Sequence, residues 1–174
     1  ATIVQMAVVL GATHPATLTA MAVPLISAGL MAVAYGAWFL VKALRQKAPE
    51  TIEMGRAFSF RSALILAATM GAVLLAAAAL NAWLGRAGLI AGTAIAGFAD
   101  THSPAVSVAS LAAGGKLEAA ETLLPILLAM STNTITKMVL AAANGGGRFA
   151  SQVIPGLLLT IAAGWLGGLQ SVVN

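Results

Sequence analysis

The stretch SFRSALILAATMGAVLLAAAALNAWL, residues 59–84, decides the class of fold. After Arg61 it holds no charged residue, and about 20 apolar residues in a helix span a hydrocarbon core of about 30 Å. The whole chain shares this character, because 60% of its 174 residues are hydrophobic and only 8% are charged. Soluble domains carry about 25% charged residues. We therefore expect a protein solvated by a lipid bilayer, which excludes a cytosolic enzyme and a nucleic-acid-binding module.

Outward from this run, four more apolar runs have the length of a membrane span. They predict helices over residues 16–44, 87–113, 117–143 and 149–173. Residues 1–12 are apolar but too short to cross, so they predict a partial or interfacial helix. Only helices and closed barrels can span lipid, and the sequence shows no pattern typical of strands. We predict an all-α fold, a polytopic transmembrane helix bundle of about five spans that forms one domain over residues 1–174.

Lysine and arginine residues predict the orientation, since they gather on the cytoplasmic side. Residues 45–57 form the one clearly aqueous stretch, and with their flanks they carry five basic residues. Lys116 falls on the same side if every run crosses, whereas Arg86 and Arg148 fall opposite. This split predicts that the 45–57 loop and the C-terminus are cytoplasmic. The chain has no cysteine, which excludes disulfides and thiolate metal sites, and its opening residues do not resemble a signal peptide.

Polar side chains enter the third and fourth predicted spans near their midpoints. On a continuous third helix, Asp100 would share a face with Thr93, Gly97 and three serines. The fourth span holds STNTITK, residues 131–137, at its centre. Two adjacent antiparallel spans therefore bring polar groups to one depth. The candidate ion-binding or translocation residues are Asp100, His102, Ser103, Ser107, Asn133, Thr134 and Lys137.

These residues allow more than one interpretation. A carboxylate at the bilayer centre costs about 2.5–3.5 kcal/mol, so Asp100 needs a partner or water. It could form a structural ion pair with Lys137 that holds two helices together. Alternatively, Asp100 and Asn133 are candidate oxygen ligands of a bound divalent metal ion such as Mg²⁺, whereas His102 would suit zinc, nickel or iron better. Pro104 is expected to break the third helix, and broken helices at the midplane are where transporters bind ions.

Other motifs have structural explanations. His102 could be a metal ligand, a proton acceptor or a packing residue. Glu118 and Glu121 open the fourth span, where carboxylates favour the helix dipole, so we expect them to cap it. Gly164 and Gly168 form a small-residue face that is typical of close helix contact.

Three classes of function remain from these residues. The first is a cation transporter or channel with a polar site at the midplane. The second is an accessory or sensor subunit without transport activity of its own. The third, an intramembrane aspartyl protease, needs two carboxylates that share a proton, and we expect no enzyme here because Asp100 stands alone. Pairing of two Asp100 residues in a homo-dimer, with Gly92, Ala96 and Gly97 at the interface, would strengthen the first class.

Four motifs together carry a resemblance to a known family. They are FSFRSAL (residues 58–64), GFAD (97–100), SVASLAAGG (107–115) and STNTITK (131–137). Over about residues 1–166 the chain resembles the C-terminal membrane module of some MgtC/SapB-family proteins. The resemblance implies a multi-pass protein of the bacterial inner membrane, an MgtC-like membrane domain as a partner, and a role in metal-ion homeostasis, notably of magnesium. Where it leads us to expect a second acidic residue, two after Asp100, this chain has His102.

Overall fold

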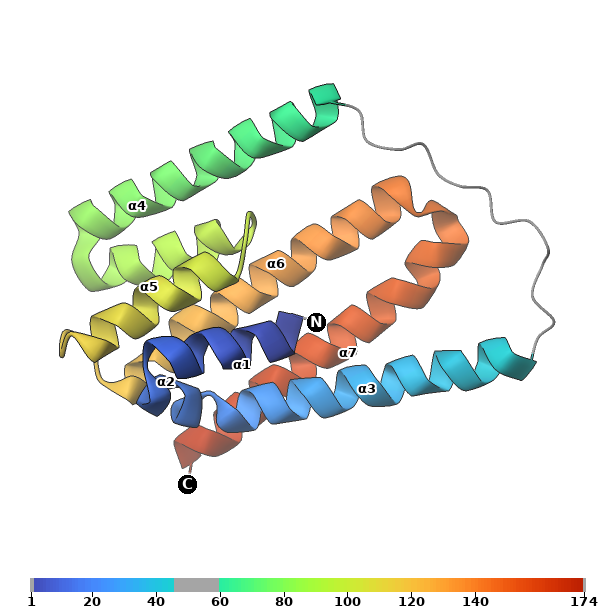
Figure 1. The fold of residues 1–174 in the computed structure, drawn as a ribbon, viewed down its shortest axis with the longest axis horizontal. Helices are drawn as coiled ribbons and strands as arrows, with labels where there is room; N and C mark the ends of the chain where they lie inside the picture. Colours follow the sequence, from blue (N-terminus) through green and yellow to red (C-terminus); the bar gives the residue numbers. More distant parts are fainter. Residues whose placement is uncertain (1, 46–59, 174) are drawn as a thin grey trace.

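The computed structural model describes residues 2–45 and 60–173, and every element within these ranges is helical (Figure 1). The elements are α1 (Thr2–Thr13), α2 (Pro15–Ala20), α3 (Ala22–Arg45), α4 (Phe60–Gly97), α5 (His102–Ala113), the 3₁₀ helix η1 (Ala119–Thr122), α6 (Leu123–Asn144) and α7 (Gly146–Val173).

Three segments in the described part of the chain are long and apolar enough to cross a membrane. They are Ala22–Lys42, Ala119–Asn144 and Gly146–Ser171. This confirms the all-α prediction and agrees with a protein that resides in a membrane. The first predicted run is shorter than expected, because Met21 separates α2 from α3.

The predicted third span is not one crossing helix. At Gly85 the backbone takes φ 55°, a conformation that glycine adopts without steric cost, and the chain doubles back. Residues 86–97 then run to the middle of the bundle, and α5 returns to the end from which they came (Figure 1). We call residues 86–113 the α4–α5 hairpin, with Phe98–Thr101 as its tip. The expected break near Asp100 is confirmed, whereas the expected crossing is wrong.

Pro104 does not cause this break. It lies in the first turn of α5, which begins at His102, and a proline there gives up an N–H that has no partner within the helix anyway. The prediction that Pro104 interrupts a continuous helix is therefore wrong, because the helix has already ended at Gly97.

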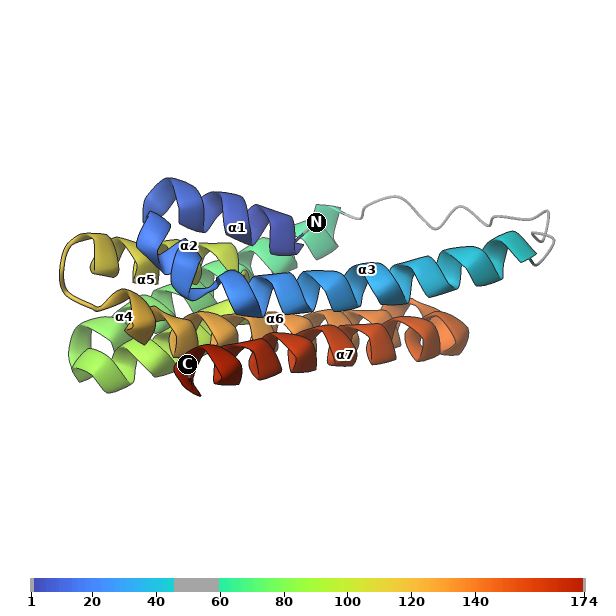
Figure 2. The same ribbon diagram turned by 90° about the horizontal axis from the view of Figure 1, so that it is seen from below.

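The same order of elements occurs twice along the chain. A 12-residue helix, a short helix and a long helix follow one another as α1, α2 and α3, and again as α5, η1 and α6. Corresponding elements meet, since α1 packs on α5 and α2 on η1, while α3 packs on α7 and α6 on α4. Pro24 and Pro125 are both the third residue of their long helix. Both 12-residue helices run from the middle of the bundle toward one end (Figures 1 and 2).

Large apolar side chains and glycines pack the helices together. Met6, Leu10, Met21 and Ile126 are fully buried between the two halves. On α7, a Cβ added at Gly164 would lie 3.6 Å from Ala28 Cβ, and one at Gly168 would lie 2.8 Å from a Leu127 methyl group. The predicted close contact of this glycine face is confirmed, and it is made to α3 and α6 of the same chain.

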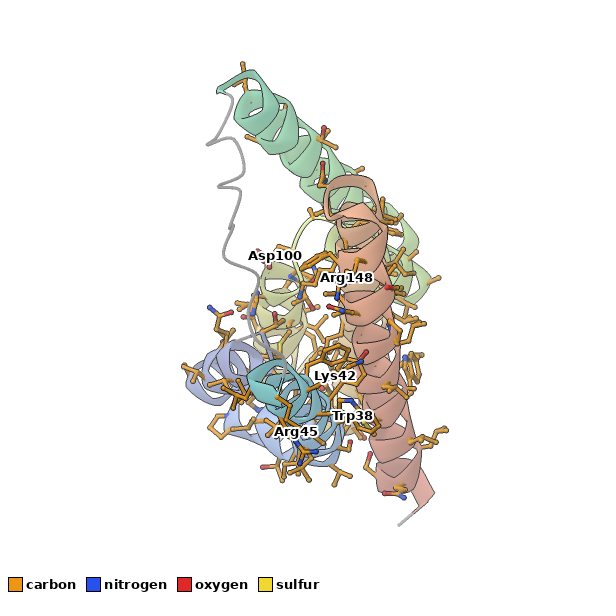
Figure 3. All side chains as sticks on the ribbon, turned by 90° about the vertical axis from the view of Figure 1, so that its right-hand side faces the viewer. Trp38, Lys42, Arg45, Asp100 and Arg148 are labelled. Carbon is orange, nitrogen blue, oxygen red and sulfur yellow. The ribbon has the colours of Figure 1, made fainter. Side chains whose placement is uncertain are left out.

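The hairpin changes the predicted sidedness. Because the chain doubles back, the turn between α6 and α7 lies at the same end of the bundle as the C-terminal end of α3. Lys42 and Arg45 are in the last turn of α3 and Arg148 is near the start of α7, so they belong to this end (Figures 1 and 3). The C-terminus lies at the opposite end (Figure 1), with the turn that holds Lys116. Placing Arg148 opposite the first loop, and the C-terminus on the side of that loop, is therefore wrong. Most of the predicted aqueous loop, residues 46–57, lies outside the described residues.

Candidate functional site

A cavity of about 230 Å³ lies inside the bundle, where the two 12-residue helices begin. It is bounded by the start of α1, the residue before α5, and the middles of α3, α6 and α7. Its lining is apolar apart from one ammonium, one amide and several hydroxyl groups. The lining residues are Thr2, Ile3, Ala28, Ala32, Thr101, Met130, Asn133, Thr134, Lys137, Leu157, Thr160 and Ile161.

Lys137 brings a positive charge to this cavity. Its Nζ donates a hydrogen bond of 3.0 Å to Oγ1 of Thr2, and this bond joins α6 to α1. In the part of the chain that the structure describes, no ion pair joins Lys137 to Asp100. The predicted structural ion pair between these two residues is therefore wrong, because each has taken another partner.

Asp100 caps α5 from the hairpin tip. Its Oδ2 accepts hydrogen bonds from the backbone N–H of Ser103 at 2.8 Å and from the Ser103 hydroxyl at 2.7 Å. Its Oδ1 lies 2.9 Å from His102 Nδ1. A carboxylate at this position satisfies an N–H that the helix itself leaves unpaired and complements the helix dipole. Asp100, His102 and Ser103 thus form one local cluster beside the cavity, and none of them lines it.

Thr101 lies between this cluster and the cavity. It precedes the first residue of α5, its side chain is only 1% exposed, and it lines the cavity. Its hydroxyl has no hydrogen-bond partner among the described residues, and neither has the buried Nε2 of His102. A buried hydroxyl without a partner costs about 1–3 kcal/mol. An unpaired hydroxyl is therefore buried in the wall of the cavity, at the start of α5.

The hydroxyls of Thr134 and Thr160 are already engaged as donors. Thr134 donates to Met130 O and Thr160 to Gly156 O, each at 2.7 Å, so both bonds stay within one helix. Back-bonding of this kind is common for threonine in helices. These two residues can only accept hydrogen bonds from a molecule in the cavity.

The structure separates the seven predicted site residues into three groups. Asn133, Thr134 and Lys137 line the cavity, and Asp100, His102 and Ser103 form the cap of α5. Ser107 lies one turn after Ser103 on the exposed face of α5, and it does not line the cavity. The predicted stripe does not exist, because Thr93 and Ser107 belong to the two opposite arms of the hairpin.

Sequence reasoning missed three polar cavity residues, Thr2, Thr101 and Thr160. Thr2 belongs to a segment that is too short to cross a membrane, and Thr160 is one hydroxyl in an apolar run. Thr101 stood between two more conspicuous residues, Asp100 and His102. The available signal was its position directly before a helix that restarts in the middle of the bundle.

The residues expected to meet in a dimer pack inside this chain instead. A Cβ at Gly97 would overlap the Thr132 hydroxyl and the Ala129 carbonyl on α6, and Ala96 is 5% exposed. Another contact holds the hairpin tip to α6, because the Thr136 hydroxyl donates to Phe98 O at 2.9 Å. Placing Gly97 and Ala96 at a dimer interface is therefore wrong.

The proposed metal ligands do not converge. Asn133 lines the cavity, whereas both oxygens of Asp100 are held by Ser103 and His102. The described residues also contain no group of three or more histidine, cysteine or acidic side chains placed to hold a metal ion. The divalent-cation site at Asp100 and Asn133 therefore stays a prediction.

The predicted cap at the start of the fourth span is confirmed. The backbone N–H of Glu118 donates to Oε2 of Glu121 at 3.0 Å, and the reciprocal bond completes a capping box on η1. These carboxylates therefore serve the helix terminus, at the end of the bundle that lies away from the tip.

Three helices long and apolar enough to cross a membrane, in an all-helical fold, indicate the class of helical membrane proteins. The family model described as "Domain of unknown function (DUF4010)" matches residues 1–145, and the chain belongs to this family. The match covers Thr101 and the cavity residues of α1, α3 and α6, and it ends before those of α7. No curated protein and no solved structure matches the chain.

Proposed function

We propose that this protein is an integral membrane transporter whose substrate binds in the cavity between α1, α3, α5, α6 and α7. The observation that carries the proposal is the cavity itself, which holds a half-buried ammonium and a buried hydroxyl without a partner inside an apolar bundle. Such polar groups are costly in a membrane and mark substrate pathways.

The arrangement of half-length helices supports this proposal. Helices α1 and α5 have 12 residues each, about 18 Å at 1.5 Å per residue, roughly half of a hydrocarbon core of about 30 Å. Both begin at the cavity. Discontinuous helices that start near the midplane, at the interface between structural repeats, form the substrate sites of many secondary transporters.

In the membrane, we propose four crossings, by α3, the part of α4 before Gly85, α6 and α7. The α4–α5 hairpin and α1 each enter from one side and stop near the middle. The end with Lys42, Arg45 and Arg148 is then cytoplasmic, since basic residues are retained on that side. The bacterial inner membrane remains the location that the MgtC/SapB resemblance implies, and an MgtC-like membrane domain remains the proposed partner.

A divalent cation such as magnesium is the substrate that the sequence led us to expect. That form of the proposal requires Asp100 to leave Ser103 and His102 and turn toward Asn133. It also places a cation beside the ammonium of Lys137, which repels it. Transport through the cavity therefore has better support than magnesium as the ion.

An accessory or sensor subunit is the second candidate function. One observation favours it: polar groups at this depth also hold elements together, as in the bonds of Lys137 to Thr2 and of Thr136 to Phe98. In this candidate the polar centre has a structural role and the partner domain carries the activity.

Filling the cavity tests the proposal. Purified protein in liposomes is assayed for uptake of sodium, magnesium, chloride, sulfate and acetate. Ala32→Phe places a ring in the cavity, whereas Ala37→Phe, on the exposed side of the same helix, is the matched control. We expect Ala32→Phe alone to abolish flux. Absence of flux for every ion in the wild-type protein would favour the accessory role.

A further inference from the structure

We propose that the cavity binds a small anion, a halide, an inorganic oxyanion or a short carboxylate, between Lys137 and Thr101. This inference rests on the proposed function, because it names the class of substrate for the same cavity. It differs from the expectation that Asp100 coordinates a cation.

The charge of the cavity lining favours an anion. The ammonium of Lys137 is the one charged group in the wall of the cavity. The carboxylates within the described ranges are Asp100, Glu118 and Glu121, and none of them lines it. Asp100 lies nearby, with both oxygens directed to donors at the start of α5. An anion in the cavity would thus meet a positive charge without a carboxylate in direct contact.

The hydrogen-bond donors in the wall of the cavity also favour an anion. Lys137 gives one of its three N–H groups to Thr2 and keeps two for a ligand. Thr101 lines the cavity, and its hydroxyl is buried without a partner in the described structure. The Asn133 amide adds N–H donors to the same wall. A ligand that accepts hydrogen bonds would satisfy Thr101 as well as Lys137.

The size and polarity of the cavity restrict the ligand. A volume of about 230 Å³ is below the roughly 300–1,000 Å³ of sites for drug-sized molecules. The remaining wall is aliphatic, from Ile3, Leu157 and Ile161 among others. A small anion that has lost part of its hydration fits this space, whereas a nucleotide or a large organic acid does not.

Thermal unfolding of the purified protein in detergent tests the inference, because a ligand that binds the folded state raises Tm. Sodium chloride, nitrate, sulfate and acetate are compared with sodium gluconate, whose anion is larger, at equal ionic strength. Magnesium chloride is compared with sodium chloride at equal chloride concentration. We expect at least one small anion to raise Tm in a saturable way, and magnesium to add nothing beyond its chloride.

Two variants and one control locate the site. Lys137→Gln and Thr101→Val should each weaken anion binding about tenfold or more, as expected for a lost hydrogen bond to a charged group. Thr101→Val should not lower Tm in gluconate, since the hydroxyl it removes has no partner to lose. Ser107→Ala, on the exposed face of α5, should bind as the wild type does. A folded Thr101→Val protein keeps the test decisive even if Lys137→Gln does not fold.

The remaining outcomes distinguish a failure of the anion site from a failure of the proposed function. Stabilisation by magnesium that Asp100→Asn abolishes would overturn the anion and leave transport through the cavity standing. Anion binding that survives Lys137→Gln and Thr101→Val would place the anion elsewhere and overturn the inference. If no ion of either sign alters Tm, and none crosses the liposome membrane, both the inference and the proposed function are wrong.

Discussion

The ammonium of Lys137 on α6 donates a hydrogen bond to the hydroxyl of Thr2 on α1 across 3.0 Å. The two residues are 135 positions apart and come from the two halves of the repeated order of elements. Lys137 therefore has two roles in this geometry. It links the halves, and it brings a charge to the space between them.

Replacing Lys137 by methionine removes both the bond to Thr2 and the charge, and unfolding and flux then report on the two roles separately. A charge within the membrane is costly and methionine has a similar volume, so we expect Lys137→Met to change the free energy of unfolding by less than about 1.5 kcal/mol. Flux in liposomes should be lost. Lys116→Met, which removes an exposed charge from a turn, is the control and should keep full flux. A Lys137→Met protein that is destabilised by several kcal/mol would assign the residue a structural role.

Gly97→Ala tests the packing of the hairpin on α6. The added Cβ would overlap Thr132 and Ala129, and overpacking of this kind costs about 1–3 kcal/mol. Gly36→Ala is the control, since nothing lies within 4 Å of its Cβ and alanine is favoured over glycine in a helix. Denaturant unfolding in detergent should show a loss for Gly97→Ala and none for Gly36→Ala. Equal stability of the two variants would contradict the close packing described here.

Asp100→Ala tests the cap of α5. It removes the acceptor of two hydrogen bonds from Ser103 and one contact with His102, so we expect a destabilisation of about 0.5–2 kcal/mol. Asp100→Asn keeps one acceptor oxygen and should lose less. Thermal unfolding of both variants measures this order. If Asp100 is instead an ion ligand, Asp100→Asn will abolish flux at unchanged stability.

Cysteine labelling tests the sidedness. The chain has no native cysteine, so single cysteines at Ala48, Gly147 and Ala113 can be compared in spheroplasts with an impermeant thiol reagent. The fold places the α6–α7 turn at the same end as Arg45, so the cysteines at 48 and 147 should behave alike, and the one at 113 oppositely. Labelling that groups 113 with 48 would mean that the hairpin crosses the membrane.

Composition and run length predicted the helical class, because a chain with so few charges has few alternatives to lipid. They did not predict the hairpin over residues 86–113. A crossing helix and two half-length arms have the same apolar pattern, and the difference depends on the positive φ at Gly85 and on Gly97, which lets the tip approach α6.

The candidate site was predicted only in part, because helical spacing relates residues only along one continuous helix. Asn133, Thr134 and Lys137 lie on one continuous helix, so helical spacing placed them on one face, and all three line the cavity. The position of Asp100 depended on a helix that does not continue. Thr2 and Thr101 come to the cavity through contacts between α1, α5 and α6, which periodicity along one helix cannot reveal.

The bond from Thr136 to Phe98 O also bears on how the protein is made. The tip of the hairpin has non-helical backbone and a carboxylate, which lipid alone does not satisfy. The hydroxyl that holds it comes 38 residues later in the chain, so that contact cannot form until α6 has left the ribosome. In the proposed topology, the hairpin therefore gains this contact with α6 only after α6 has been synthesised, and its final position depends on the order in which the helices emerge.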